Sequence, residues 1–104
     1  MERIINKAVV CADGFSMSVQ GHEGAYCHPR INNAEKYTEV EVGFPSEREE
    51  LLMEWAESPN RPTETVYAWV PITVVRDVIA KHGGIVQGEL PPGIPYLEAP
   101  SREV

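Results

Sequence analysis

The sequence is poor in basic residues, in cysteine and in long apolar runs. Nine lysines and arginines face sixteen acidic residues, and the net charge of −7 argues against direct binding of nucleic acid, which needs a basic surface. No apolar run approaches the roughly 18 residues of a membrane-spanning helix, and the N-terminus lacks the apolar core of a signal peptide. We therefore expect a cytoplasmic protein that has no membrane partner and keeps Cys11 and Cys27 as reduced thiols.

Motifs for catalysis and for metal binding are scarce as well. Cys11, His22, Cys27 and His28 are residue types that bind zinc, but they lack the paired C-x-x-C or H-x-x-x-H spacing of zinc sites. Cys27 and His28 could be a nucleophile and its base, but neighbours in an extended segment point apart. We predict no catalytic residue, no metal site and no cofactor. A small-molecule site, or a small enzyme, in the loop of Tyr26, Cys27 and His28 stays open as the alternative.

The length and composition predict one domain followed by a different kind of segment. A chain of 104 residues with 42% hydrophobic residues can bury one modest core. Residues 1–88 carry the patterns of strands and helices, whereas residues 89–104 hold four prolines that exclude a regular helix. This tail is too apolar to be plainly disordered. We expect an extended arm that packs on its own molecule or on a second copy, which would make a homodimer.

A β-hairpin is predicted for residues 7–20, with Asp13-Gly14 as its turn. This pair suits a two-residue turn, which needs positive φ. The alternation of apolar and polar residues after the turn indicates a strand with one buried face. A two-residue turn would place Val9 and Cys11 on the polar face, and a one-residue slip would reverse this assignment. The apolar face would then hold Ala8, Val10, Ala12, Phe15, Met17 and Val19.

The remaining patterns complete an α+β fold. Residues 37–44 alternate as a third strand, and Ser46 and Glu49 have the spacing of a capping box that opens a helix ending near residue 57. In a fourth strand, residues 65–70, Tyr67 and Trp69 would share one side. A second helix from about residue 72 would end at His82, a cap residue, and a short strand near 85–87 would follow. We predict a small, mostly antiparallel sheet in β-β-β-α-β-α order, with two helices on one face and an extended Pro-rich arm.

The acidic residues cluster in the middle of the chain. Seven glutamates and one arginine lie between positions 39 and 57. Such a block can be a solvated face, or it can dock on a basic surface of another protein. The second interpretation defines a candidate partner-binding surface, to which the loop of residues 21–36 would add its exposed side chains. Its residues are Glu39, Glu41, Glu47, Glu50, Glu54, Glu57, Tyr26 and His28.

Several segments together resemble a group of small proteins of unknown function that tailed phages and prophages encode. They are CADGFSMSVQ, AYCHPR, YTEVEVGFPS, LLMEWAE, TVYAWVP and KHGG, and they cover most of residues 9–84. No catalytic motif comes with that group, so the resemblance implies a setting in a host cell and no functional residue. Small acidic phage proteins of this kind are often inhibitors of a host defence or regulatory protein, as the anti-CRISPR proteins are. By this analogy, and from the acidic stretch, we expect a non-enzymatic binding protein that inhibits or modulates a host protein with a basic surface.

Overall fold

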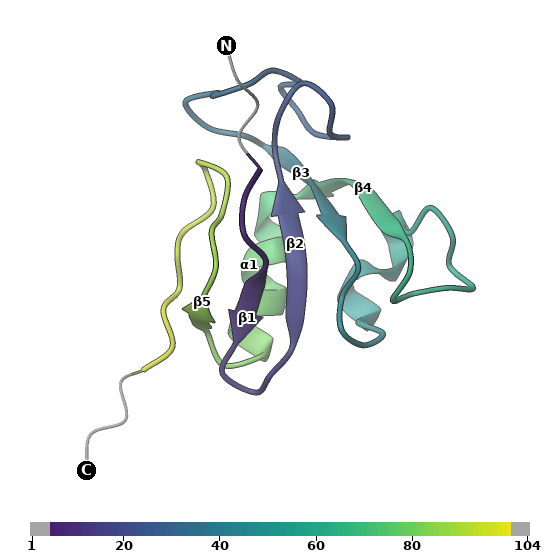
Figure 1. Ribbon diagram of the computed structural model, residues 1–104, viewed down its shortest axis with the longest axis vertical. Helices are drawn as coiled ribbons and strands as arrows, with labels where there is room; N and C mark the ends of the chain where they lie inside the picture. The colour runs from purple at the N-terminus through teal and green to yellow at the C-terminus, as the bar shows by residue number, and fades with distance from the viewer. Residues whose placement is uncertain (1–4, 101–104) are drawn as a thin grey trace.

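The computed structural model describes residues 5–100, and its five strands form one antiparallel sheet. The elements are β1 (Val9–Cys11), β2 (Ser16–Gln20), β3 (Glu39–Gly43), the 3-10 helix η1 (Glu50–Trp55), β4 (Val66–Pro71), α1 (Ile72–Lys81) and β5 (Ile85–Gln87). The strand order is β4-β3-β2-β1-β5, and each pair of neighbours is antiparallel (Figure 1). The α+β class is confirmed. No helix within residues 5–100 is long and apolar enough to cross a membrane.

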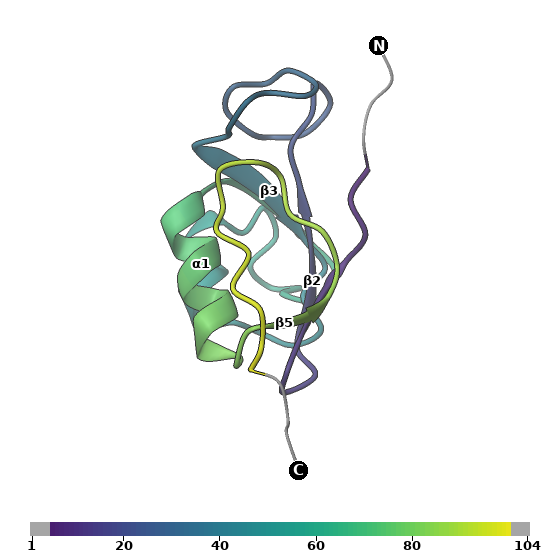
Figure 2. The ribbon, with the colours of Figure 1, turned by 90° about the vertical axis from the view of Figure 1, so that its left-hand side faces the viewer.

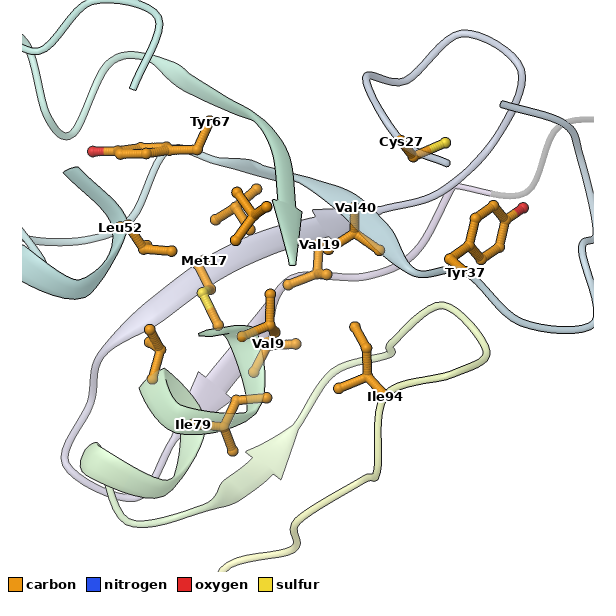
Figure 3. Packing of buried hydrophobic residues seen from close by; sticks show 14 of the residues in the cluster. Val9, Met17, Val19, Cys27, Tyr37, Val40, Leu52, Tyr67, Ile79 and Ile94 are labelled. Atoms are coloured by element: carbon orange, nitrogen blue, oxygen red, sulfur yellow. The ribbon is translucent and has the colours of Figure 1, made fainter. Parts of the chain in front are cut away.

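One face of the sheet carries the hydrophobic core. The helix α1 lies against this face (Figure 2) and buries Val75, Val78 and Ile79, which recur at helical spacing. Leu52 of η1 joins the same core and is fully buried. The strands contribute alternate residues, which the close view of Figure 3 shows pointing into one layer. These strand residues are Val9, Cys11, Met17, Val19, Val40, Val42, Tyr67, Val70 and Ile85.

The hairpin has a turn one residue longer than predicted, so the two faces of β1 are exchanged, whereas Phe15, Met17 and Val19 are buried as predicted. Val9 pairs with Met17, and the N–H of Cys11 donates to the carbonyl of Phe15 at 2.8 Å. Three residues then form the loop, with Gly14 at φ 94° in the left-handed position that such loops need. Val9 and Cys11 are buried in the core, so the prediction that they lie on the polar face is wrong.

The first predicted α-helix is a short 3-10 helix, and its predicted capping box is absent. The hydroxyl of Ser46 accepts the N–H of Ser16 at 2.9 Å instead of capping a helix. Glu49 is itself the N-cap residue, and its carboxylate accepts the N–H of Leu51 at 2.9 Å. The side chain of Glu49 is 2% exposed and lies below the surface. The predicted order β-β-β-α-β-α is thus replaced by β-β-β-η-β-α-β, with β5 at the sheet edge.

The C-terminal segment lies along the outer edge of β5. Ile85 donates its N–H to Leu97 at 2.8 Å and accepts that of Ala99 at 2.9 Å, which satisfies backbone groups that an edge strand would expose. Ile94 is buried against the core, and its position is seen in Figure 3. The short strand predicted near residues 85–87 is confirmed. Residues 101–104 of the predicted arm lie outside the described residues.

The observed hairpin register predicts that substitutions at the neighbouring residues Val9 and Val10 lower the free energy of unfolding by different amounts. Val9→Thr places a hydroxyl in the core, where it lacks a partner, and should lower the free energy of unfolding by about 1–3 kcal/mol. Val10→Thr changes a half-buried side chain of the opposite face and should stay within about 0.5 kcal/mol. Urea unfolding followed by circular dichroism measures both. Equal losses, or a larger loss at Val10, would contradict the register.

Candidate functional site

The loop between β2 and β3 presents alternate side chains to solvent. Ala25 and Cys27 are buried, whereas Tyr26 is half-buried and His28 is exposed. The thiol of Cys27 donates to the carbonyls of His22 and Pro29 at 3.3 and 3.4 Å. Burial raises the pKa of the Cys27 thiol, although the hydrogen bond with the His22 backbone and the charge of a nearby arginine oppose the rise. A buried, neutral thiol that points away from His28 is a poor nucleophile.

A β-bulge in β4 turns Trp69 to the surface. Val40 pairs with Val70 and Val42 pairs with Tyr67, so Ala68 and Trp69 together face the single residue Glu41. Trp69 has φ 51°, a left-handed conformation that a bulky side chain rarely adopts. The extra residue separates the two aromatic side chains that were expected to share one side. Tyr67 is buried in the core, whereas Trp69 is 45% exposed.

The loop and the bulge hold each other in place. The backbone N–H of Trp69 donates to the carbonyl of Tyr26 at 3.0 Å, and the N–H of Tyr26 donates to Glu41 Oε2 at 3.2 Å. The rings of Tyr26 and Trp69 lie 5.0 Å apart at a tilt of 34°, a favourable geometry for an aromatic pair. The Arg30 guanidinium lies 5.3 Å from the centre of the Tyr26 ring, within the range of a cation–π contact.

Four of the predicted partner-binding residues belong to this one surface. His28 pairs with Glu39 in an isolated bridge, and Glu39 and Glu41 alternate with the buried Val40, so both point away from the core. Together with the aromatic pair they define what we call the Tyr26–Trp69 patch. It consists of Tyr26, His28, Arg30, Glu39, Glu41 and Trp69.

The other four predicted residues lie elsewhere. Glu47, Glu50, Glu54 and Glu57 are exposed around η1, which packs on the core side of the sheet. Glu50 is paired with Arg48. The predicted acidic stretch is therefore divided between the two sides of the sheet.

Trp69 and Arg30 were not predicted as site residues. Trp69 was expected to pack with Tyr67, because a bulge leaves no mark in a run of strand-forming residues. Arg30 ends a polar loop, and only the fold brings it to Tyr26.

A second cluster of titratable side chains joins three elements, with Glu49 and His82 buried and Asp13 and Lys81 half-exposed. His82, at the C-terminal end of α1, lies 2.6 Å from Asp13 Oδ2 through Nδ1 and 2.6 Å from Glu49 Oε1 through Nε2. Lys81 donates to the other oxygen of Glu49 at 2.8 Å. Phe15 stacks on the imidazole, with 4.0 Å between the ring centres. We call these groups the His82 clamp: Asp13, Glu49, Lys81 and His82.

The pKa values in the clamp favour the charged forms. Burial disfavours the carboxylate of Glu49, but the hydrogen bonds from Lys81, the Leu51 N–H and His82 outweigh it and lower the pKa of Glu49. Burial likewise opposes the imidazolium, but the contacts with both carboxylates raise the pKa of His82. The N–H of Phe15, followed by His82, lowers the pKa of Asp13.

The clamp holds histidine and carboxylates, the residue types of acid–base catalysis, but it has no nucleophile and lacks the geometry for that chemistry. Both ring nitrogens of His82 face carboxylates, so the imidazolium has no free lone pair with which to accept a proton. Its 7% exposed side chain is also closed to a substrate. The clamp therefore ties the hairpin, η1 and α1 together, and the reading of His82 as a simple helix-end residue and of Asp13 as a simple turn residue is incomplete.

Among residues 5–100 no three or more histidine, cysteine or acidic side chains are arranged to hold a metal ion. Cys11 and Cys27 are both free and buried, and burial and the charge of Asp13 raise the pKa of Cys11 to about 11.

No protein-family model, no curated protein and no solved structure matches this chain.

The clamp predicts that the stability of the protein is highest over a range of pH and falls at both lower and higher pH. A raised pKa at His82 gives stabilisation that is complete below the usual value of 6.5 and is lost as pH rises through the folded-state pKa. Lowered pKa values at Glu49 and Asp13 give stabilisation that is complete above 4.5 and is lost as pH falls. The melting temperature should therefore be highest between pH 4.5 and 6.5.

The variant His82→Gln should lower that maximum and flatten the decline above pH 6.5. Thermal melts from pH 4 to 9 followed by circular dichroism measure this, with the exposed His28→Gln as the matched control. An unchanged alkaline decline in His82→Gln would assign the decline to another group.

Proposed function

We propose that this protein is a non-enzymatic binding protein that occupies a basic surface of a host protein with its Tyr26–Trp69 patch. The observation that carries the proposal is Trp69, which is held half-exposed in a left-handed conformation and stacked on Tyr26. Phe44 shares this conformation, and what distinguishes Trp69 is its contact with the Tyr26 ring and the hydrogen bond from its N–H to the Tyr26 carbonyl. The clamp and the buried thiols favour a binding role over a catalytic one.

The composition of the patch also supports binding of another protein. Tryptophan and tyrosine are among the residue types in which interface hot spots are enriched. Glu39 and Glu41 add negative charge beside them, and the whole chain carries −7, so a basic partner would be drawn to this surface. The resemblance to phage and prophage proteins supports a host defence or regulatory protein as that partner, with inhibition or modulation as the result of binding.

Trp69 and Phe44 are two exposed aromatic side chains that share one backbone conformation. Phe44 has φ 50° and is 58% exposed, much as Trp69 has φ 51° and is 45% exposed. Asparagine tolerates this conformation, so Trp69→Asn and Phe44→Asn should both fold. A tagged protein should capture one dominant partner from bacterial host lysate, and Trp69→Asn should weaken its binding at least tenfold.

The matched control Phe44→Asn should bind as the wild type does, because Phe44 lies outside the patch. Melting curves establish that both variants are folded. Unchanged binding by a folded Trp69→Asn would sink the proposal.

A second prediction compares the two halves of the acidic stretch. The double variant Glu39→Gln with Glu41→Gln removes two charges from the patch, and glutamine can still accept the N–H of Tyr26. It should weaken binding of the captured partner several-fold and reduce its salt dependence. Glu54→Gln with Glu57→Gln removes the same charge near η1 and should have a smaller effect. Equal effects, measured by calorimetry at two salt concentrations, would point to net charge instead of the patch.

A further inference from the structure

The Tyr26–Trp69 patch already holds one cation of the protein itself. The guanidinium of Arg30 lies over the Tyr26 ring, and its Nε donates to the carbonyl of Glu23 at 3.1 Å. Arg30 is exposed, and a cation–π contact at an exposed site is weak. Little free energy is therefore lost when the Arg30 guanidinium leaves the Tyr26 ring.

The surroundings of Tyr26 match the chemistry that recognises arginine. A guanidinium stacks on aromatic faces and pairs with carboxylates, and it is more weakly hydrated than an ammonium group. The patch offers two aromatic rings, at 5.0 Å from each other, and the carboxylates of Glu39 and Glu41. Glu41 Oε2 is fixed against the Tyr26 backbone, so one carboxylate is positioned before any partner arrives.

We infer that the Tyr26–Trp69 patch binds an arginine side chain of its basic protein partner, and that Arg30 occupies this place in the free protein. The inference rests on the proposed function and adds the chemistry of the contact. A partner arginine would displace Arg30 from the Tyr26 ring and take up the negative field of Glu39 and Glu41. Arg30 is then a competitor in cis, and its removal should strengthen binding.

The test uses a short capped peptide, Gly-Arg-Gly-Arg-Gly, and the same peptide with citrulline in place of arginine. Citrulline keeps the shape of the side chain and lacks the charge. The chain has two tryptophans, so a Trp55→Phe background leaves Trp69 as the only fluorescent reporter of the patch. Binding is measured by Trp69 fluorescence and by the shift of its indole N–H signal in NMR spectra.

The expected result is saturable binding of the arginine peptide and none of the citrulline peptide. Arg30→Met should tighten the arginine peptide about two- to fivefold, which is the range of an exposed cation–π contact. Arg48→Met removes the same charge beside η1, where Arg48 pairs with Glu50, and should leave the affinity near that of the wild type. A weaker or unchanged affinity in Arg30→Met, relative to Arg48→Met, would overturn the inference.

The failure of this inference can be told apart from failure of the proposed function. If neither peptide binds, but folded Trp69→Asn loses the captured protein partner, the arginine contact is wrong and the binding surface stands. If folded Trp69→Asn keeps the partner, the binding surface itself is wrong, and the arginine inference falls with it.

Discussion

The imidazolium of His82 is the constraint on which much of the fold depends. It joins Asp13 in the hairpin turn to Glu49 before η1 and does so from the end of α1, over 69 and 33 positions of sequence. A buried carboxylate is costly unless it is paired and hydrogen-bonded, and Glu49 is satisfied by His82, Lys81 and the Leu51 N–H together. Glu49 turns to these partners and Ser46 accepts the N–H of Ser16, so the two side chains do not form a capping box.

The sequence reveals the parts of the fold that depend on local periodicity. The alternation in residues 37–44 and the helical spacing of Val75, Val78 and Ile79 indicate β3 and α1, and both elements form. The hairpin register was missed because Asp13-Gly14 suits a two-residue turn and also the end of a three-residue loop. Glu49 is predicted only as a member of a capping box, and its burial is not foreseen because charged side chains are almost never fully buried without partners. Its partners come from distant segments, and no local pattern announces them.

The candidate surface could likewise be predicted only in part, because contacts between distant segments leave no local pattern in the sequence. Tyr26, His28, Glu39 and Glu41 could be proposed from their residue types and exposed positions, but their assembly with Trp69 depends on one bulge. The bulge places Trp69 opposite Glu41 and directs its N–H to the carbonyl of Tyr26, so a loop from the far side of β3 is recruited across the sheet. The sequence does not show that β4 contains a bulge at Ala68 and Trp69, because a run of strand-forming residues looks the same with or without an extra residue.

The His82 clamp and the Tyr26–Trp69 patch use charged and aromatic groups in different ways. In the His82 clamp every acidic and basic group is paired with another member of the cluster, and these contacts hold the hairpin, η1 and α1 together. In the Tyr26–Trp69 patch hydrogen bonds fix the backbone of both aromatic residues, and their side chains stay partly in solvent. An aromatic pair whose backbone is already fixed loses less conformational entropy when a partner covers it. The free-energy cost of the left-handed conformation at Trp69 arises on folding, so it does not weaken binding.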